Sequence, residues 1–466
     1  MKVEQIYTGC LAMAAYYIES NGEAAIIDPL RETAPYIRKA EKDNARIKYI
    51  FETHFHADFV SGHVELAEKT GATIVYGPDA NCRFECYSAI DGEEFKVGAV
   101  TIKALHTPGH TPESTTYLLI DETGKQHCIF TGDTLFIGDV GRPDLAIKSD
   151  ITKEDLAGML YESLHTKILT LPDDLIVYPA HGAGSACGKS MSKETFDTLG
   201  HQKKVNYALQ PMSKEAFVKE ITDGLLPAPQ YFSKNAEMNK DGAGSLDNVY
   251  EHGLKKLSPA EFEVIVEETN ALVLDTRDPQ VFATGFIPKS INVGLNGQFA
   301  PWIGALITDL KQPIVVVCDE GKEEETVRRL ARVGYDNTLG YLDGGISAWN
   351  NAGKAIDVVN SISPAEFEAR YAKGALDILD VRRPNEYATG HVTNAENKPL
   401  DFINDWTGDL NRDKTYYVHC AGGYRSMITA SILKSRGFEN LVEVQGGYGA
   451  IAKTNISKTD LVAETK

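Results

Sequence analysis

The sequence predicts an α/β protein built from three domains, and three observations lead to this prediction. Up to about residue 240, short β-branched runs alternate with helical stretches. The polar, glycine-rich segment 239–248 then predicts a linker. Beyond it the chain repeats itself, because "SPAEFE" begins at Ser258 and again at Ser363. A chain of 466 residues is also too long for a single hydrophobic core.

The strands expected in the first domain are apolar runs that end beside glycine or a polar residue. The segment "VSGHVELAEKTG" has helical periodicity and is closed by Gly71, so it predicts a helix. The predicted strands lie at 24–28, 47–51, 73–77, 116–120, 127–132 and 174–180.

The repeated region predicts two small α/β domains of one type. Each copy continues to a strand that ends in a cysteine, Cys318 or Cys420, followed by an amphipathic helix and a glycine pair. The offset between the copies is far above the period of about 20 to 50 residues of a solenoid. We therefore expect domains at 1–245, 254–356 and 360–460.

Composition excludes some classes of function. The formal net charge is −19, whereas binding to nucleic-acid phosphates needs clustered Lys and Arg. No apolar run approaches the length of a membrane span, and "MKVEQIYTGC" lacks the layout of a signal peptide. Seven scattered cysteines predict no disulfide framework and suit a reducing compartment, and Cys82 and Cys86 do not predict a metal site. We expect a cytoplasmic protein that binds neither nucleic acid nor membrane.

Candidate metal ligands follow four of the predicted strands. The ends of neighbouring strands meet at one edge of an α/β sheet, so side chains placed there can converge on one point. A single surface histidine is usually only solvated, but several His and Asp residues placed after strands and beside glycine predict a metal site. These candidates are His54, His56, Asp58, His110, Asp133 and His181.

Residues 1 to about 240 resemble the metallo-β-lactamase superfamily, whose pattern is H-x-H-x-D-H followed by separate His, Asp and His. The resemblance implies an αββα sandwich for this domain. The chain departs from the pattern at Phe59, where the superfamily has a histidine that helps to hold a second metal. We therefore expect one metal ion per chain.

Within that superfamily the chain looks like the persulfide dioxygenases. The resemblance implies one Fe(II) per chain held by His54, His110 and Asp133. A face of two histidines and one carboxylate leaves positions for substrate and dioxygen, and zinc has no redox chemistry. His56, Asp58 and His181 would then orient ligands or bind water, or serve only as structural hydrogen-bonding groups.

Three more residues are candidates near this site. Arg142 is expected either to bind carboxylates of a thiol substrate or to pair with Asp139 or Asp144. Cys187 follows His181 by six residues and is expected to line the pocket, where Lys189 would favour its thiolate. An inert, packed cysteine is the alternative.

The segment "VHCAGGYRSMITASILKSRGF" predicts a sulfur-binding loop. Cys420 follows a strand, then come Gly422, Gly423 and Arg425, and then a helix. Backbone N–H groups at a helix N-terminus and a nearby arginine favour the thiolate, which is the nucleophile. C-x4-R occurs in rhodaneses and in cysteine phosphatases, but the upstream "DVRRPNEYATGH" resembles the rhodanese pattern, and a six-residue loop suits sulfur or sulfite. An inert copy and a phosphatase remain the alternatives.

The first copy differs at the corresponding loop. Cys318 is followed by "DEGKEE", which has no arginine and four acidic residues. Negative charge would disfavour the thiolate and repel sulfite. We expect a degenerate rhodanese domain kept for architecture.

The order of the domains resembles bacterial persulfide dioxygenase–rhodanese fusions of sulfide detoxification. The resemblance implies that a low-molecular-weight thiol persulfide and dioxygen give sulfite and free thiol, and that sulfite then takes sulfur from a Cys420 persulfide to give thiosulfate. The thiol carrier is left open, and a homo-oligomer is compatible with this interpretation. The alternatives are a zinc-dependent, glyoxalase II-like thioester hydrolase and a non-enzymatic persulfide carrier or sensor.

Overall fold

A computed structural model of the chain describes residues 1–147, 151–225 and 227–459. The chain forms two compact units. Met1–Asn248 and Leu330–Gly334 make up the first, and Val249–Arg329 and Tyr335–Lys466 the second. The end of the third predicted domain, residue 460, lies outside the described residues.

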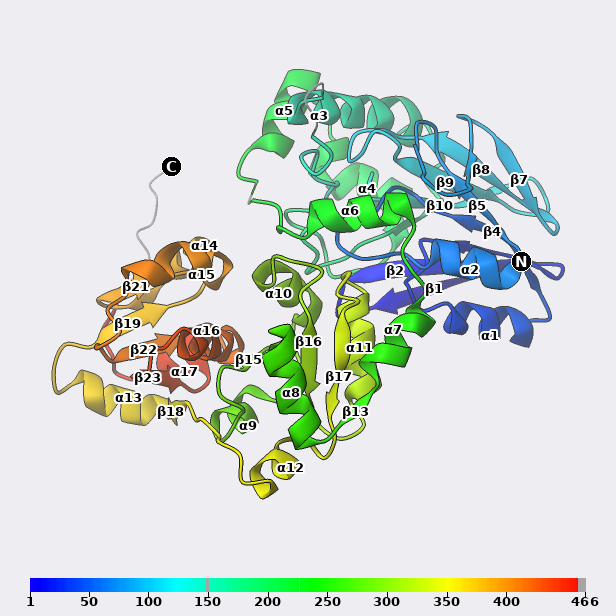
Figure 1. Cartoon of the computed structure of the whole chain (residues 1–466). Coiled ribbons are helices and arrows are strands. Elements are labelled where there is room, and N and C mark those ends of the chain that lie inside the picture. The colour runs from blue at the N-terminus through cyan, green and yellow to red at the C-terminus, as the bar shows by residue number, and fades with distance from the viewer. Residues whose placement is uncertain (148–150, 226, 460–466) are drawn as a thin grey trace. The chain divides into compact units, whose positions relative to one another are not determined.

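The first unit contains two six-stranded mixed sheets (Figure 1). The first sheet has the order β1 (Lys2–Thr8), β2 (Met13–Ser20), β3 (Glu23–Ile27), β4 (Arg46–Phe51), β5 (Thr73–Tyr76) and β6 (Tyr87–Ser88). The second has the order β12 (Asp197–Thr198), β11 (Ile176–Pro179), β10 (Gln126–Gly132), β9 (Thr115–Ile120), β8 (Val100–His106) and β7 (Glu94–Val97).

The two sheets face each other across a continuous apolar core. Side chains such as Tyr16 and Phe51 of the first sheet pack in one cluster with Tyr117 and Phe130 of the second. Burying aromatic and branched side chains of this kind stabilises each by roughly 1.5–3 kcal/mol. The sheets are therefore held as a sandwich.

Helices cover the outer faces of this sandwich. Helices α1 and α2 contact strands of the first sheet, and α3 and α5 pack on the second sheet in a separate core that contains Leu160 and Phe217. The helices of this unit are α1 (Ala34–Lys42), α2 (His63–Thr70), α3 (Lys153–Glu162), α4 (Leu199–Val205), α5 (Lys214–Thr222) and α6 (Phe232–Asp241). The predicted αββα sandwich is confirmed.

The predicted linker at 239–248 is largely helical. Helix α6 ends at Asp241 and α7 (Leu246–Gly253) begins after four intervening residues, so only a short glycine-containing break separates them. The Asn239 amide is buried and donates to the carbonyls of His56 and Phe59, at 2.8 and 2.7 Å. Composition predicted a linker, but this packing makes Asn239 part of the first unit.

The second unit contains two parallel five-stranded sheets with the same topology (Figure 1). The first copy has the order β13 (Lys256–Leu257), β17 (Thr338–Leu342), β16 (Ile314–Val317), β14 (Leu272–Asp275) and β15 (Ile291–Asn292). The second has β18 (Asn360–Ile362), β23 (Leu441–Val444), β22 (Tyr416–His419), β19 (Asp377–Asp380) and β21 (Ala395–Asn397). A two-stranded sheet joins β20 (His391–Val392) to β24 (Lys458–Thr459).

The helices of the two copies also correspond, and the repeated sequence explains how they start. Ser258 and Ser363 each cap the N-terminus of the first helix, which begins with proline. The first copy has α8 (Pro259–Thr269), α9 (Pro279–Ala283), α10 (Phe299–Leu306), α11 (Glu323–Ala331) and α12 (Gly345–Asn351). The second has α13 (Pro364–Tyr371), α14 (Pro384–Ala388), α15 (Ile403–Trp406), α16 (Tyr424–Ser435) and α17 (Gly447–Ile451). The two predicted α/β copies are confirmed.

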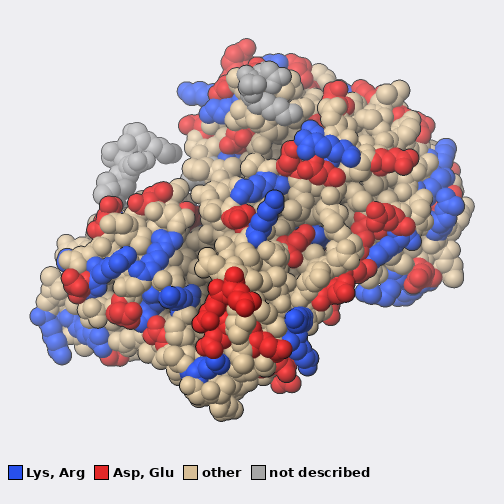
Figure 2. Space-filling model, in the orientation of Figure 1, with Lys and Arg blue, Asp and Glu red and all other residues tan. Residues whose placement is uncertain are grey.

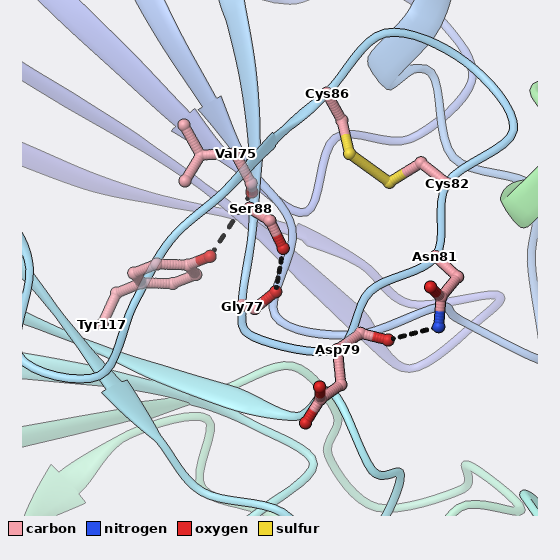
Figure 3. The surroundings of a disulfide bond; sticks show 8 residues. All are labelled: Val75, Gly77, Asp79, Asn81, Cys82, Cys86, Ser88 and Tyr117. Atoms are coloured by element: carbon pink, nitrogen blue, oxygen red, sulfur yellow. Dashed lines mark hydrogen bonds between the residues drawn. A yellow bond between two sulfur atoms is a disulfide. The ribbon is translucent and has the colours of Figure 1, made fainter.

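One pair of cysteines departs from expectation. Cys82 and Cys86 form a disulfide in the loop between β5 and β6 (Figure 3). The expectation that the cysteines form no disulfide is wrong for this pair, because the loop turns back and brings the two Cα atoms to 6.6 Å.

On the face drawn in Figure 2, acidic and basic side chains are interspersed rather than gathered into one basic field. Among the described residues, none of the helices combines the length and the apolar character needed to cross a bilayer.

Candidate metal centre and sulfur-transfer loop

Three of the predicted ligands meet in the interior of the first unit. His54 follows β4, His110 lies in the loop after β8, and Asp133 follows β10. Each is at most 2% exposed, and their ligand atoms all lie within 4.8 Å of one another. Asp133 Oδ2 lies 3.3 Å from His110 Nε2 and 3.8 Å from His54 Nε2. The structure therefore brings together two imidazoles and one carboxylate, a set that can hold a metal ion.

Hydrogen bonds turn the Nε2 atoms of both histidines toward this point. His110 Nδ1 lies 2.9 Å from the Arg142 carbonyl, which can only accept, so Nδ1 carries the proton. His54 Nδ1 lies 3.0 Å from Thr53 Oγ1, whose own proton goes to Asp28 Oδ2. Each Nε2 then presents a lone pair, the arrangement that a metal ligand requires.

The Asp133 carboxylate is prepared for a cation. In the part of the chain that the structure describes, buried Oδ2 has no hydrogen-bond partner, while Oδ1 lies 2.8 Å from His181 Nδ1. Burial raises the pKa of Asp133, but the charged His181 beside Oδ1 outweighs burial and holds the pKa of this carboxyl well below its usual range. A buried carboxylate oxygen without a partner is costly unless a cation satisfies it. The site therefore fits a metal ion.

His56 does not join the three ligands. Its Nε2 lies 3.1 Å from Asp28 Oδ1 and 3.5 Å from Glu52 Oε2. Burial lowers the pKa of His56, but the two carboxylates outweigh burial and raise it to about 10. A protonated imidazole has no lone pair for a metal. The Phe59 ring lies against it, with the two centroids 4.4 Å apart.

His181 links two carboxylates beside the metal site. Its Nδ1 contacts Asp133 Oδ1 and its Nε2 lies 2.9 Å from Asp58 Oδ2. Burial lowers the pKa of His181, but Asp133 and Asp58 outweigh burial and raise it well above its usual value. Asp58, His181 and Cys187 also form a second buried group whose ligand atoms lie within 4.8 Å of one another.

Lys189, which was predicted to assist Cys187, is bound elsewhere. The Lys189 ammonium donates to the carbonyl oxygens of Glu220, at 2.8 Å, and Asp223. Burial, together with Asp58 and Asp133, raises the pKa of the Cys187 thiol well above its usual value. The prediction that Lys189 favours a Cys187 thiolate is therefore wrong, because main-chain carbonyls hold the ammonium.

Arg142 takes one of the two roles left open by the sequence. Its Nε and Nη2 donate to the two carboxylate oxygens of Asp144, at 2.6 and 2.7 Å. The Arg142 N–H also donates to the Cys187 carbonyl at 2.9 Å. Asp139 instead accepts from the N–H groups of Lys189 and Ser190. Arg142 thus ties the His110 loop to the Cys187 loop.

The sequence missed three residues that hold the ligand loop between His54 and Ser61. Asp28 and Glu52 bind His56, and the Asn239 amide binds the loop carbonyls and, through Oδ1, accepts from Ser61 N–H at 2.8 Å. Asp28 carried a usable signal, since it follows an apolar strand as the other candidates do. Asn239 carried none, because it is distant in sequence.

In the second unit, the Cys420 loop joins β22 to α16. The Gly423 N–H donates to Cys420 Sγ at 3.1 Å, and Gly423 has a φ of 102°, a conformation that glycine adopts without strain. Ser426 Oγ lies 3.6 Å from the same sulfur and donates to Glu443 Oε1 at 2.8 Å. The loop therefore directs the Gly423 N–H at the Cys420 sulfur.

Arg425 is the second residue of α16, directly after this loop, and is tied to a carboxylate. Its Nη1 and Nη2 donate to Glu386 Oε2 and Oε1, at 2.6 and 2.7 Å. Cys420, Gly422 and Arg425 all line one cavity of about 400 Å³. The predicted residues of this loop thus lie together around an accessible hollow.

Cys318 in the first copy has a different setting. Burial, followed by Glu323, Asp275 and Asp319, raises the pKa of its thiol to about 12. At neutral pH Cys318 is a thiol and not the nucleophilic thiolate.

Comparison with known proteins agrees with the fold. The model of the "Metallo-beta-lactamase superfamily" matches residues 8–85. The human protein named "Persulfide dioxygenase ETHE1, mitochondrial" is 33% identical over 214 residues, which are 45% of this chain and 74% of that protein. The chain belongs to the metallo-beta-lactamase superfamily. The model of the "Rhodanese-like domain" matches residues 258–352 and 363–454, so this superfamily member also carries two rhodanese-like domains.

Two further matches connect this metallo-beta-lactamase superfamily member with other proteins. An Arabidopsis thaliana protein named "Hydroxyacylglutathione hydrolase cytoplasmic" is 33% identical over 165 residues, which are 35% of this chain and 60% of that protein. A solved structure of a metallo-beta-lactamase from Staphylococcus aureus has a TM-score of 0.64 and 30% identity, and the match covers 73% of this chain and 98% of that one.

Proposed function

We propose that the chain oxidises a low-molecular-weight thiol persulfide to sulfite with one Fe(II) ion, and that Cys420 transfers sulfur to sulfite to give thiosulfate. The observation that carries the first step is the buried Asp133 Oδ2, which has no partner among the described residues and lies between the Nε2 atoms of His54 and His110. Two histidines and one carboxylate are the ligands of non-haem Fe(II) oxygenases. The similarity to the human persulfide dioxygenase supports this choice.

An iron(II) ion held by His54, His110 and Asp133 would supply the redox chemistry with dioxygen that zinc lacks. The surrounding residues keep the ligands in place: Thr53 and the Arg142 carbonyl fix the two imidazoles, and His181 holds Asp133 Oδ1. Phe59 stands where the superfamily pattern has a histidine for a second metal, and its ring packs on His56, which pairs with Asp28. These contacts support one ion at the His54, His110 and Asp133 site.

The sulfur-transfer step uses the Cys420 loop. The Cys420 thiolate attacks the outer sulfur of R–S–SH, the S–S bond breaks, R–S⁻ leaves, and Cys420 carries the persulfide. Sulfite then attacks the outer sulfur of deprotonated Cys420–S–S⁻, which releases thiosulfate and restores the thiolate. The Gly423 N–H, which points at the sulfur, stabilises negative charge in both states.

A zinc-dependent thioester hydrolase is the second candidate. The similarity to a hydroxyacylglutathione hydrolase favours it, as does the second buried group of Asp58, His181 and Cys187, which could hold another ion. Such an enzyme would use a metal-bound hydroxide and would not need the Cys420 loop.

The test combines metal analysis of anaerobically purified protein with product analysis. We expect one iron per chain, oxygen uptake on glutathione persulfide, and thiosulfate as the product. Cys420→Ser should keep oxygen uptake but accumulate sulfite, because the iron ligands lie in a different unit from Cys420. Two zinc ions per chain at full activity, with hydrolysis of S-lactoylglutathione, would favour the hydrolase. Loss of oxygen uptake in Cys420→Ser at normal iron content would contradict the modular scheme.

A further inference from the structure

The cavity over Cys420 has walls from both rhodanese copies. The second copy supplies the Cys420 loop together with Arg383 and Glu386, and the first copy supplies Gln298 and Trp302. Trp302 belongs to α10, and Gln298 is the exposed residue that precedes this helix. The first copy therefore forms one side of the second copy's site.

Direct contacts hold the first copy against the Cys420 loop. The Tyr424 hydroxyl donates to the Gly294 carbonyl at 2.7 Å. Gly297 lies so close to the Tyr424 ring that a β-carbon there would be 2.6 Å from Cε2. Tyr424 follows the glycine pair of the loop, so the segment that leads into Gln298 is packed on the loop itself.

Buried hydrogen bonds continue this contact beneath the cavity. The Asn292 N–H in β15 donates to Ser431 Oγ in α16 at 3.0 Å, and both residues are fully buried. Gln280 Nε2 donates to Glu443 Oε2 at 3.2 Å. Leaving such groups without partners would cost about 1–3 kcal/mol each, so the position of the first copy's wall is fixed by specific bonds.

The size of the cavity exceeds the needs of sulfite. A water molecule occupies about 30 Å³ in the liquid, so an ion of four heavy atoms fills a small part of about 400 Å³. Cavities for organic ligands span about 300–1,000 Å³. The size suits an organic sulfur donor better than an inorganic anion.

The lining also suits an organic thiol. Trp302 and Tyr424 supply aromatic surface, Gln298 supplies an amide, and Arg383 supplies a guanidinium. Aromatic surface binds an apolar stem, the amide binds peptide-like groups, and arginine binds carboxylates. Together they match a small thiol that carries amide and carboxylate groups.

We propose that the first rhodanese copy is a substrate-binding wall of the Cys420 site, where Trp302 and Gln298 hold the organic part of a low-molecular-weight thiol persulfide while its outer sulfur is transferred to Cys420. This inference rests on the proposed sulfur transfer. It gives the degenerate copy a role in choosing bulky organic donors over small inorganic ones.

The test compares two sulfur donors of different size in the full-length chain. Glutathione persulfide is the large donor, thiosulfate is the small donor, and formation of thiocyanate from cyanide reports transfer without oxygen or iron. Gln298→Ala and Trp302→Phe should each raise KM for glutathione persulfide about tenfold, with KM for thiosulfate changed less than twofold. Cys318→Ser is the control in the same copy, and both of its KM values should match the wild type.

A second measurement does not depend on turnover. S-methylglutathione should slow the alkylation of Cys420 by iodoacetamide in the wild type, and Gln298→Ala should remove most of this protection. Because Gln298 is exposed, its replacement leaves the fold intact even if Trp302→Phe disturbs α10. Circular dichroism checks both variants.

The outcomes separate the two proposals. An equal change in KM for both donors, or unchanged protection of Cys420 in Gln298→Ala, would overturn the proposal that the first copy binds the organic part of the donor. A wild type that transfers sulfur from neither donor would overturn the Cys420 function, and the alkylation measurement would still decide whether the first copy binds the thiol.

Discussion

Arg425 offers a quantitative test of the Cys420 loop. Its guanidinium makes two hydrogen bonds with Glu386, at 2.6 and 2.7 Å, and its side chain is 15% exposed. Burial lowers the pKa of Arg425, but Glu386 outweighs burial and raises it, so the side chain stays charged. We expect Arg425→Ala to remove one positive charge beside the reacting sulfur while the Gly423 N–H remains.

The expected size is that of one charge-assisted hydrogen bond from the guanidinium to the transferred sulfur, because Arg425 and Cys420 line the same cavity. Such a bond contributes about 1.5–3 kcal/mol, and solvent in the cavity screens part of it. A loss of about 1–3 kcal/mol in the transition state lowers kcat/KM by about 5- to 150-fold, because about 1.4 kcal/mol corresponds to a factor of ten. Cys420→Ser should instead abolish transfer.

The assay is thiocyanate formation from thiosulfate and cyanide. Arg370→Ala is the matched control, since Arg370 pairs with Glu366 at 2.7 Å on α13, and neither residue lines the Cys420 cavity. The control should retain wild-type kcat/KM. If Arg425→Ala stays within twofold of the wild type while its circular dichroism is unchanged, the guanidinium does not stabilise the transferred sulfur and the electrostatic reasoning fails.

Four further substitutions test other parts of the molecule. His110→Ala should lose the metal and all oxygen uptake. His56→Ala should keep most of the metal, because the His56 imidazole is bound by Asp28 and Glu52. Equal loss of metal from both variants in elemental analysis would instead show that His56 is a ligand. Cys318→Ser should leave sulfur transfer within twofold, and a tenfold loss with the fold intact would show that the first copy is active. Burial raises the pKa of Glu443 in the folded protein, although three hydrogen bonds lower it. The contribution of Glu443 to the free energy of unfolding is therefore complete below the ordinary pKa of about 4.3 and is lost as pH rises through the higher folded pKa. The melting temperature of Glu443→Gln should therefore rise relative to that of the wild type between pH 5 and pH 8. A constant difference between the two melting temperatures over this range would contradict the reasoning.

The sequence predicted most of the metal site because local order encodes it. His54, His110 and Asp133 each follow an apolar strand, and strand ends converge in an α/β fold. The repeat starting at Ser258 and Ser363 likewise encoded two domains through helix caps and strand periodicity. These signals lie within a few residues of the features they predict.

Contacts between distant segments left no such signal. The direction of Lys189 depends on where α5 ends, and the role of Gln298 depends on packing between the two copies. The Cys82–Cys86 disulfide depends on the course of one loop that spacing does not reveal. Packing between segments that are distant in sequence determines each of these features, and the sequence motifs carry no information about that packing.

The ligands of the metal site come from both layers of the sandwich. His54 extends from the first sheet, whereas His110 and Asp133 extend from the second. A bound ion would therefore cross-link the two sheets, and the free energy of metal binding would become folding free energy by mass action. Free metal at 100 times its Kd would add about 2.7 kcal/mol. The melting temperature of the first unit should thus rise with the supply of metal, and chains without metal would be the first to unfold and be degraded.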